Sequence, residues 1–208
     1  MPGVVVECGC FLGGTSTNLS LACALAGRQL VLYDSFEGMP PPAPGETLAQ
    51  PEWTGGLRGS LEEVRANIAR TGNLAVCTFR KGWFADTLPQ HREPIVLAFL
   101  DVDSEASLDQ CVRHLWPHLV PDGTLFLDEY VFLDFCALFF SETYWQRNFG
   151  EHPPGLMGAG CGVGVGDYYW GPLLAAPPLQ HSRSIAYTWK GNSGYWRYDP
   201  DASTQTNV

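Results

Sequence analysis

Short apolar runs alternate with longer amphipathic stretches along most of the chain. The runs are rich in β-branched and aromatic residues and follow turn signals, so they predict buried strands. They lie at 4–7, 29–33, 74–79, 95–99 and 124–126. The stretches between them predict helices at 17–26, 61–70 and 104–116. The second helix follows the capping-box sequence Ser60-Leu61-Glu62-Glu63. This alternation is typical of an α/β protein with a mainly parallel sheet.

The last part of the chain predicts a different ending. An aromatic-rich amphipathic helix is expected over 133–145, and a further strand over 168–170. Two more runs, at 184–189 and 195–198, flank a turn that contains glycine and predict an antiparallel hairpin. A hairpin after parallel βα units gives a mixed sheet. The polar tail over 200–208 is expected to be frayed.

Composition narrows the class of protein. The 208 residues are most simply one domain, 1–208, and the hydrophobic fraction of 45% is ordinary for a globular protein. The formal net charge of −10 argues against nucleic-acid binding, which needs clustered Lys and Arg. Seven cysteines without a C-x-x-C pair favour reduced thiols over disulfides or a zinc site. Without a long apolar run or a signal-peptide pattern, we expect a cytoplasmic chain that does not span a membrane.

Two of the predicted strands end in carboxylates. Asp101 and Asp103 follow one apolar run, and Asp128 and Glu129 follow the next. Ligands of open α/β sheets bind at the carboxyl ends of the strands, so we expect these four side chains at one edge. Such an oxygen-rich site suits Mg²⁺, which takes one or two carboxylates with water and substrate oxygens. For any single Asp, capping of the following helix is the alternative.

The segment after the first strand has the composition of a ligand-binding turn. Glycines follow Glu7 at Gly9, Gly13 and Gly14. Their spacing differs from the dinucleotide pattern G-x-G-x-x-G, and the absence of a following Lys excludes a P-loop. Glu7 can accept hydrogen bonds from the ammonium of an amino-acid ligand, while Thr15 or Ser16 can cap the next helix. A tight strand-to-helix turn without a ligand is the alternative.

Asp34 ends the second predicted strand, where a carboxylate commonly binds the ribose diol of a nucleotide. Together with Glu7 and Gly9, this residue fits S-adenosylmethionine better than NAD, because a dinucleotide lacks the ammonium group. The segment 35–59 is rich in Pro and Gly, and its length is typical of a lid over a binding site.

Aromatic residues follow the third predicted strand, at the same edge of the sheet. Trp83 or Phe84 can stack on an adenine ring there. Packing under the sheet is an equal alternative for both side chains.

These motifs resemble the macrocin O-methyltransferase (TylF-like) family of S-adenosylmethionine-dependent enzymes. The matching stretches keep the family's order and are Val6-Glu7-Cys8-Gly9 with Gly13-Gly14, Asp34-Ser35-Phe36-Glu37-Gly38-Met39-Pro40, Gly82-Trp83-Phe84-Ala85-Asp86-Thr87-Leu88-Pro89, Leu100-Asp101-Val102-Asp103 and Leu127-Asp128-Glu129-Tyr130. The resemblance implies a Rossmann-like methyltransferase fold, that is, an α/β domain with a mainly parallel seven-stranded sheet, a C-terminal antiparallel hairpin and helices on both faces.

The resemblance also implies a function. S-adenosylmethionine and Mg²⁺ are the expected cofactors, and a hydroxyl of a sugar or glycosylated natural product is the expected acceptor. Asp101, Asp128 and Glu129 are the expected metal ligands. Asp101 and Asp103 are the expected catalytic residues, with Asp103 as the general base. The expected cofactor-binding residues are Glu7, Gly9, Gly13, Thr15, Ser16, Asp34, Ser35, Gly82, Trp83, Phe84 and Asp101.

Two departures from the family pattern leave alternatives open. The family usually has Asp-Asp-Tyr at Asp128-Glu129-Tyr130, and commonly Leu-Tyr-Glu-Ser at Ser104-Glu105-Ala106-Ser107. The alternatives are a catechol-type metal-dependent O-methyltransferase, a cofactor-binding module without catalysis and, last, a dehydrogenase. The expected partner is a hydroxyl-bearing small molecule, with neither nucleic acid nor a membrane, and a homodimer is a further expectation.

Overall fold

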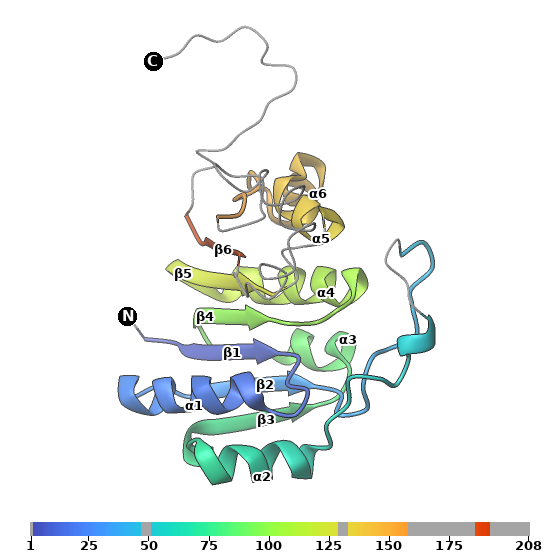
Figure 1. The fold of residues 1–208 in the computed structure, drawn as a ribbon. Helices are drawn as coiled ribbons and strands as arrows, with labels where there is room; N and C mark the ends of the chain where they lie inside the picture. Colours follow the sequence, from blue (N-terminus) through green and yellow to red (C-terminus); the bar gives the residue numbers. More distant parts are fainter. Residues whose placement is uncertain (1, 47–50, 129–132, 158–185, 192–208) are drawn as a thin grey trace, which may run out of the picture.

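The computed structural model describes residues 2–46, 51–128, 133–157 and 186–191. The strands in these residues form one six-stranded sheet in the order β3-β2-β1-β4-β5-β6 (Figure 1). They are β1 (Val4–Cys8), β2 (Leu30–Asp34), β3 (Cys77–Lys81), β4 (Ile95–Leu100), β5 (Leu119–Leu127) and β6 (Ala186–Trp189). The first five are parallel, and β6 pairs with β5 in the antiparallel direction.

The predicted Rossmann-like α/β sheet is confirmed, although the described residues hold six strands where seven were predicted. One strand of the predicted terminal hairpin is β6. Its predicted partner at 195–198 and the predicted strand at 168–170 lie outside the described residues.

Helices cover both faces of the sheet because side chains of successive strand residues point to opposite faces. The helices are α1 (Gly14–Ala26), α2 (Leu61–Thr71), α3 (Phe84–Thr87), α4 (Glu105–Leu115), α5 (Leu133–Ala137) and α6 (Glu142–Phe149). On one face, Leu30 and Leu32 of β2 share a core with α1 and α2. On the other face, Val31 and Tyr33 belong to a core that contains residues of α4 and α6. Short 3-10 turns lie at Pro51–Trp53, Leu74–Val76, Leu88–Gln90, Trp116–His118 and Leu138–Phe140.

Several element boundaries differ from the prediction. The helix predicted over 17–26 begins earlier, at Gly14, and the strand predicted over 74–79 begins only at Cys77, because Leu74–Val76 form a 3-10 turn. The single helix expected over 133–145 is two helices, because the Ser141 hydroxyl accepts a hydrogen bond from the Tyr144 N–H and starts α6 afresh. Phe135, Phe139 and Trp145 of this segment are buried, and the Trp145 and Trp116 rings meet edge to face with centroids 4.7 Å apart. β5 begins at Leu119, well before the predicted residue 124, and its pairing with β4 shifts register between Ile95 and Leu97.

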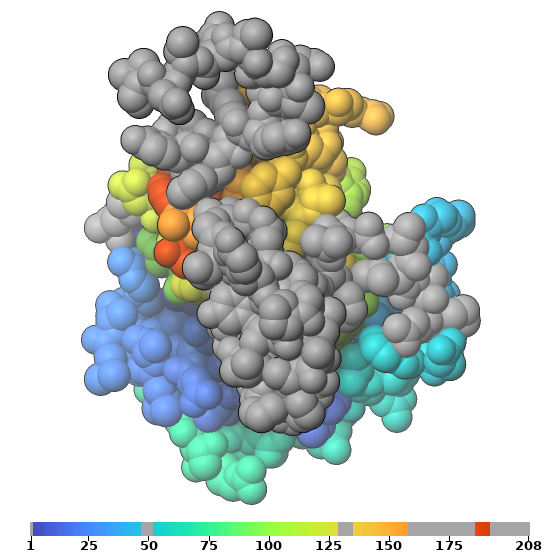
Figure 2. Space-filling model, turned by 45° about the horizontal axis from the view of Figure 1, so that its top comes forward, coloured from blue at the N-terminus to red at the C-terminus, as the bar shows by residue number. Residues whose placement is uncertain are grey.

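The connections between strands determine where a ligand can bind. The chain runs outward from β1 through β2 to β3, and then crosses back to place β4 on the other side of β1. The loops that follow β1 and β4 therefore separate at the carboxyl edge, which is the point where open α/β sheets bind ligands. The segment after β2 extends beyond this same edge (cyan in Figure 1) and projects at the right of the space-filling view (Figure 2). No helix in the described ranges is long and apolar enough to cross a membrane.

Candidate cofactor and active site

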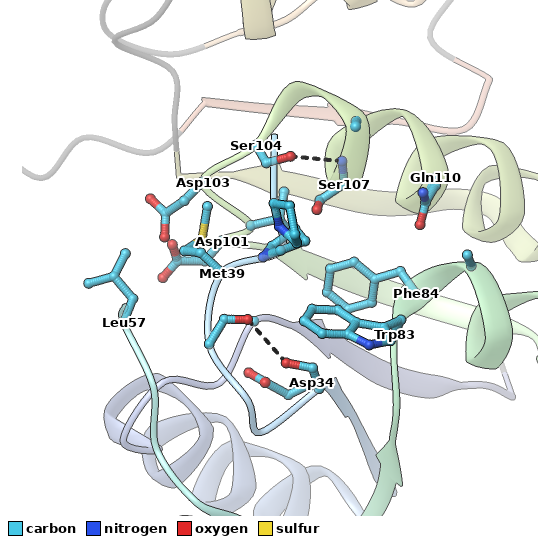
Figure 3. Close-up of a pocket in the computed structure, with 18 of the residues that line it drawn as sticks. Asp34, Met39, Leu57, Trp83, Phe84, Asp101, Asp103, Ser104, Ser107 and Gln110 are labelled. Atoms are coloured by element: carbon cyan, nitrogen blue, oxygen red, sulfur yellow. Dashed lines mark hydrogen bonds between the residues drawn. The ribbon is translucent and has the colours of Figure 1, made fainter. Parts of the chain in front are cut away.

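A cavity of about 450 Å³ opens at the carboxyl edge of the sheet (Figure 3). This volume is within the usual range for a small-molecule site. The loops after β1, β2, β3 and β4, together with the first turns of α4, contribute its lining residues: Gly9, Phe11, Asp34, Ser35, Gly38, Met39, Pro40, Pro41, Ala43, Leu57, Trp83, Phe84, Ala85, Asp101, Val102, Asp103, Ser104, Ala106, Ser107 and Gln110. Of the predicted cofactor-binding residues, the cavity brings together Gly9, Asp34, Ser35, Trp83, Phe84 and Asp101.

Gly9 allows the loop after β1 to lie directly against the loop after β4. Its φ is +87°, and a Cβ at this position would lie 1.7 Å from the carbonyl oxygen of Asp101. The Asp101 N–H donates to the carbonyl of Cys8 at 3.0 Å, which fixes the two loops together. Any residue with a side chain would force these loops apart.

The prediction that Thr15 or Ser16 caps α1 is wrong. Gly13 occupies the N-cap position in the left-handed conformation, at φ +82°, without a side-chain cap hydrogen bond. A Cβ at Gly13 would press on Val64 of α2 at 3.0 Å, so this glycine serves helix packing. Ser16 is fully buried within α1, whereas Thr15 is half-buried, and neither side chain lines the cavity.

Glu7 is fully buried near the end of β1. Neither of its carboxylate oxygens, nor the Ser16 hydroxyl, makes a hydrogen bond to the described part of the chain. Burial raises the pKa of Glu7 to about 8, and the charges of Asp101 and Asp34 add to this shift. A buried carboxyl without a partner is costly, so this position fits a cationic group of a ligand.

Asp34 organises the turn that follows β2. Its Oδ2 accepts from the Cys10 N–H at 2.6 Å, and its Oδ1 accepts from the Phe36 N–H at 2.7 Å. Each oxygen keeps further acceptor capacity toward the cavity, because an ionised carboxylate has about four lone-pair sites. Ser35 also lines the cavity, but its hydroxyl already donates to the Gly38 carbonyl at 3.2 Å.

Two aromatic side chains form one wall of the cavity (Figure 3). Trp83 remains 38% exposed, whereas Phe84 packs in part against the buried core below it. Gly82 does not line the cavity; its N–H donates to the Asp34 carbonyl at 3.0 Å and thereby sets the start of this loop. Trp83 is therefore the better candidate for stacking on a flat ligand, and Phe84 has a structural role as well.

Carboxylates gather at the opposite end of the cavity, where Asp101 and Asp103 lie close together (Figure 3). Burial raises the pKa of Asp103, and the charge of Asp128 raises it further. Asp103 has a left-handed backbone, with φ +52°, which is uncommon for a residue other than glycine and is often found at functional sites. Asp128 is exposed and lies outside the cavity lining.

The predicted metal site is only partly within the described structure. Glu129 lies outside the described residues. Among the residues that are described, no group of three His, Cys, Asp or Glu side chains could hold a metal ion.

Comparison with known proteins decides the family. A model of the macrocin O-methyltransferase (TylF) family matches residues 1–152. The chain belongs to this family. The fold agrees, because the solved structure of the O-methyltransferase NovP matches with a TM-score of 0.67 at 22% identity, over 91% of this chain and 72% of that one. The calicheamicin methyltransferase CalS11 matches with a TM-score of 0.62 at 16% identity, over 92% and 73%.

Two curated proteins are similar in sequence to this chain. One is the 8-demethyl-8-(2,3-dimethoxy-alpha-L-rhamnosyl)-tetracenomycin-C 4'-O-methyltransferase of Streptomyces olivaceus, 35% identical over 65% of this chain and 56% of that protein. The other is the mycinamicin III 3''-O-methyltransferase of Micromonospora griseorubida, 31% identical over 62% of this chain and 56% of that protein. The match thus spans about half of each relative's length.

This member of the macrocin O-methyltransferase family has further cavity residues that sequence reasoning missed. Ser104, Ser107 and Gln110 line the cavity from the start of α4 (Figure 3). Ser104 is the N-cap of α4 and accepts from the Ser107 N–H at 3.2 Å. These three polar residues are spaced three apart, so they lie on one face of the helix. This spacing is the feature of the sequence that could have identified them as cavity residues. Glu46, whose carboxylate also reaches Ser104, gave no such signal.

Proposed function

We propose that the chain is an S-adenosylmethionine-dependent O-methyltransferase that acts on a hydroxyl of a sugar or glycosylated natural product. One observation carries this proposal. A single cavity is lined by Asp34 and Trp83 toward one end and by Asp101 and Asp103 toward the other. Glu7 is not among the lining residues, but it lies two residues before Gly9, near the end of β1, and its buried carboxyl has no hydrogen-bond partner among the described residues. Both curated relatives are named as O-methyltransferases, and the name of the first describes a rhamnosyl-bearing tetracenomycin, which favours the same function.

Three residues of the proposed cofactor site have distinct roles. Glu7 accepts hydrogen bonds from the ammonium group of the methionine part, which gives the buried carboxyl a partner that the described residues do not supply. Asp34 accepts from the ribose hydroxyls with the lone pairs that its two backbone hydrogen bonds leave available. Trp83 stacks on the adenine, since its ring is the more exposed of the two aromatic rings in this wall.

The reaction is an in-line displacement at carbon, so the protein must align the acceptor oxygen with the methyl group. When bound, S-adenosylmethionine would supply a methyl group that is activated because the sulfonium sulfur that carries it can leave as a neutral thioether. Asp103 takes the proton from the acceptor hydroxyl. Its raised pKa makes it a stronger base than an ordinary carboxylate, and general base catalysis typically contributes about 10²–10⁴-fold.

A divalent cation is a separate part of the proposal. Asp101 and Asp128, with Glu129 from the undescribed segment, supply oxygen ligands of the type that Mg²⁺ takes. Such an ion would lower the pKa of the acceptor hydroxyl. We expect Asp128→Asn to raise the Mg²⁺ concentration needed for half-maximal activity. Full activity of Asp101→Asn in the presence of a chelator would contradict the metal role.

The mouth of the cavity is apolar. Phe11 and Leu57 both line it, and each side chain is 48% exposed. Leu57 and Met39 lie at the end that holds Asp101 and Asp103 (Figure 3). An acceptor hydroxyl that reaches these carboxylates would bring its apolar neighbour against Phe11 and Leu57, which suits a sugar attached to an apolar core.

The decisive experiment is calorimetric titration with S-adenosylhomocysteine, with and without Mg²⁺, followed by an acceptor screen. We expect saturable one-site binding to the wild type, at least tenfold weaker binding to Glu7→Gln and Asp34→Asn, and unchanged binding to the exposed control Glu52→Ala. Transfer of a labelled methyl group to glycosylated acceptors is then expected, with little transfer to catechols. No binding would refute the cofactor, and binding without transfer would leave a non-catalytic module.

A further inference from the structure

The carboxylate of Glu46 connects the segment after β2 to the first turn of α4. Its Oε1 accepts from the Ser104 hydroxyl at 2.8 Å and from the Ala106 N–H at 3.2 Å. Its Oε2 accepts from the Ala43 N–H at 2.9 Å, within the same segment. Glu46 is thus hydrogen-bonded both to its own loop and to a helix that begins 59 residues later.

The position favours a negative charge. The first N–H groups of a helix lack partners within the helix, and the N-terminus carries partial positive charge. Burial would raise the pKa of Glu46, but the hydrogen bonds from Ala43, Ser104 and Ala106 outweigh it and hold the pKa below its ordinary value. The carboxylate is therefore ionised at neutral pH, and its hydrogen bonds are of the stronger, charge-assisted kind.

The segment held by Glu46 forms a wall of the cavity. Gly38, Met39, Pro40, Pro41 and Ala43 all line it. At the base of the segment, the Met39 N–H donates to the Gly56 carbonyl and the Gly55 N–H donates to the Met39 carbonyl, each at 2.9 Å. This wall is thus fixed at its base by backbone hydrogen bonds and, beyond Ala43, by the hydrogen bonds of the Glu46 side chain.

The other end of the contact lies beside the carboxylates. Ser104 directly follows Asp103, and both line the cavity. A group that fixes Ser104 and Ala106 therefore also limits the movement of the Asp103 backbone, whose left-handed conformation needs support from its surroundings.

We propose that Glu46 is a positioning residue, which holds the wall 38–46 closed over the cofactor and fixes the start of α4 next to Asp103. Its hydrogen bonds to Ser104 and Ala106 open when the cofactor product leaves. This inference rests on the proposed function, because it takes the cavity to be the S-adenosylmethionine site.

The test compares Glu46→Ala, Glu46→Gln and the control Glu52→Ala with the wild type. Gln keeps an acceptor oxygen for Ser104 and Ala106 but loses the charge, whereas Ala removes all three hydrogen bonds. Glu52 is an exposed carboxylate of the same loop that does not line the cavity. The rate of S-adenosylhomocysteine release is measured by stopped-flow displacement, following tryptophan fluorescence. Hydrogen exchange of peptides covering 38–46 and 104–107 is measured without ligand.

We expect Glu46→Ala to release S-adenosylhomocysteine about tenfold faster, because a factor of about ten corresponds to the loss of one charge-assisted hydrogen bond. Hydrogen exchange of both peptides should also be faster in this variant. Glu46→Gln should lie within about threefold of the wild type, and Glu52→Ala should match it. Release and exchange at wild-type rates in Glu46→Ala would overturn the inference, as would equal effects of Gln and Ala.

The two proposals fail in distinguishable ways. If the wild type does not bind S-adenosylhomocysteine, the proposed function is wrong, whatever hydrogen exchange shows. If it binds and Glu46→Ala changes neither readout, only the role of Glu46 is wrong. Should Glu46→Ala fail to fold, Glu46→Asp gives the same comparison, because a side chain shorter by one methylene cannot span the same distance.

Discussion

Replacing Gly9 by Ala tests whether the two loops at the centre of the site depend on their close approach. A Cβ there would lie 1.7 Å from the Asp101 carbonyl oxygen, where ordinary contact needs about 3.4 Å. An Ala at φ +87° is also strained by about 1–2 kcal/mol. Moving Asp101 away breaks its hydrogen bond to Cys8, worth about 1 kcal/mol. Relieving the steric overlap adds about 1–2 kcal/mol, so we expect a total loss of roughly 3–5 kcal/mol.

Gly27→Ala is the matched control. Gly27 ends α1 with φ +63°, but no atom lies within 4 Å of the Cβ that Ala would add. The control should lose only about 1–2 kcal/mol from backbone strain. Urea unfolding, followed by tryptophan fluorescence, gives both losses, and the difference between the variants isolates the steric overlap. Gly9→Ala should also lose S-adenosylhomocysteine binding, whereas Gly27→Ala keeps it. Equal losses of stability in the two variants would refute the close approach.

Three further predictions concern single side chains. His91 is buried, with Nδ1 2.8 Å from the Tyr33 hydroxyl, and burial lowers its pKa. The free energy of unfolding should therefore fall as the pH drops below the ordinary histidine pKa of 6.5, because His91 binds a proton in the unfolded chain but not in the folded one. Urea unfolding at pH 5 and pH 8 measures this fall, which should be smaller in His91→Gln. Trp83→Ala should weaken S-adenosylhomocysteine binding about tenfold with little loss of stability, whereas Phe84→Ala should also lower the melting temperature, both read by calorimetry. Asp103→Asn should lower kcat at least about 100-fold without changing cofactor affinity, and an unchanged kcat would contradict its role as base.

The sequence predicts well which residues meet at the carboxyl edge of the sheet, because the patterns that place them there are local. Asp34 and Asp101 each directly follow an apolar run, and a parallel sheet brings such ends to one edge whatever the details of the helices. The capping box at Ser60 also proved correct, since both of its reciprocal hydrogen bonds depend on residues three apart.

Longer-range features were not predictable in the same way. The contact between Glu46 and Ser104 joins residues 58 apart, and nothing in the sequence around either residue specifies the other. Ser141 divides the helix predicted over 133–145 because one cap hydrogen bond competes with a continuous apolar pattern. Gly13, not Thr15 or Ser16, is the N-cap of α1, because packing against Val64 of α2 favours a residue without a side chain.

The crossover between β3 and β4 divides the proposed site into two parts, one from the sequence before the crossover and one from the sequence after it. The residues proposed to recognise the cofactor before Asp101 come from β1, β2 and the loops that follow β1, β2 and β3, whereas Asp101, Asp103 and Asp128 follow β4 and β5. Exchange of the second part alone would therefore replace these carboxylates but keep the apolar residues Phe11 and Leu57, which come from the first part. In such a chimera the junction that must be kept is Gly9 against Asp101, because there the two halves touch through backbone and leave no room for a compensating side chain.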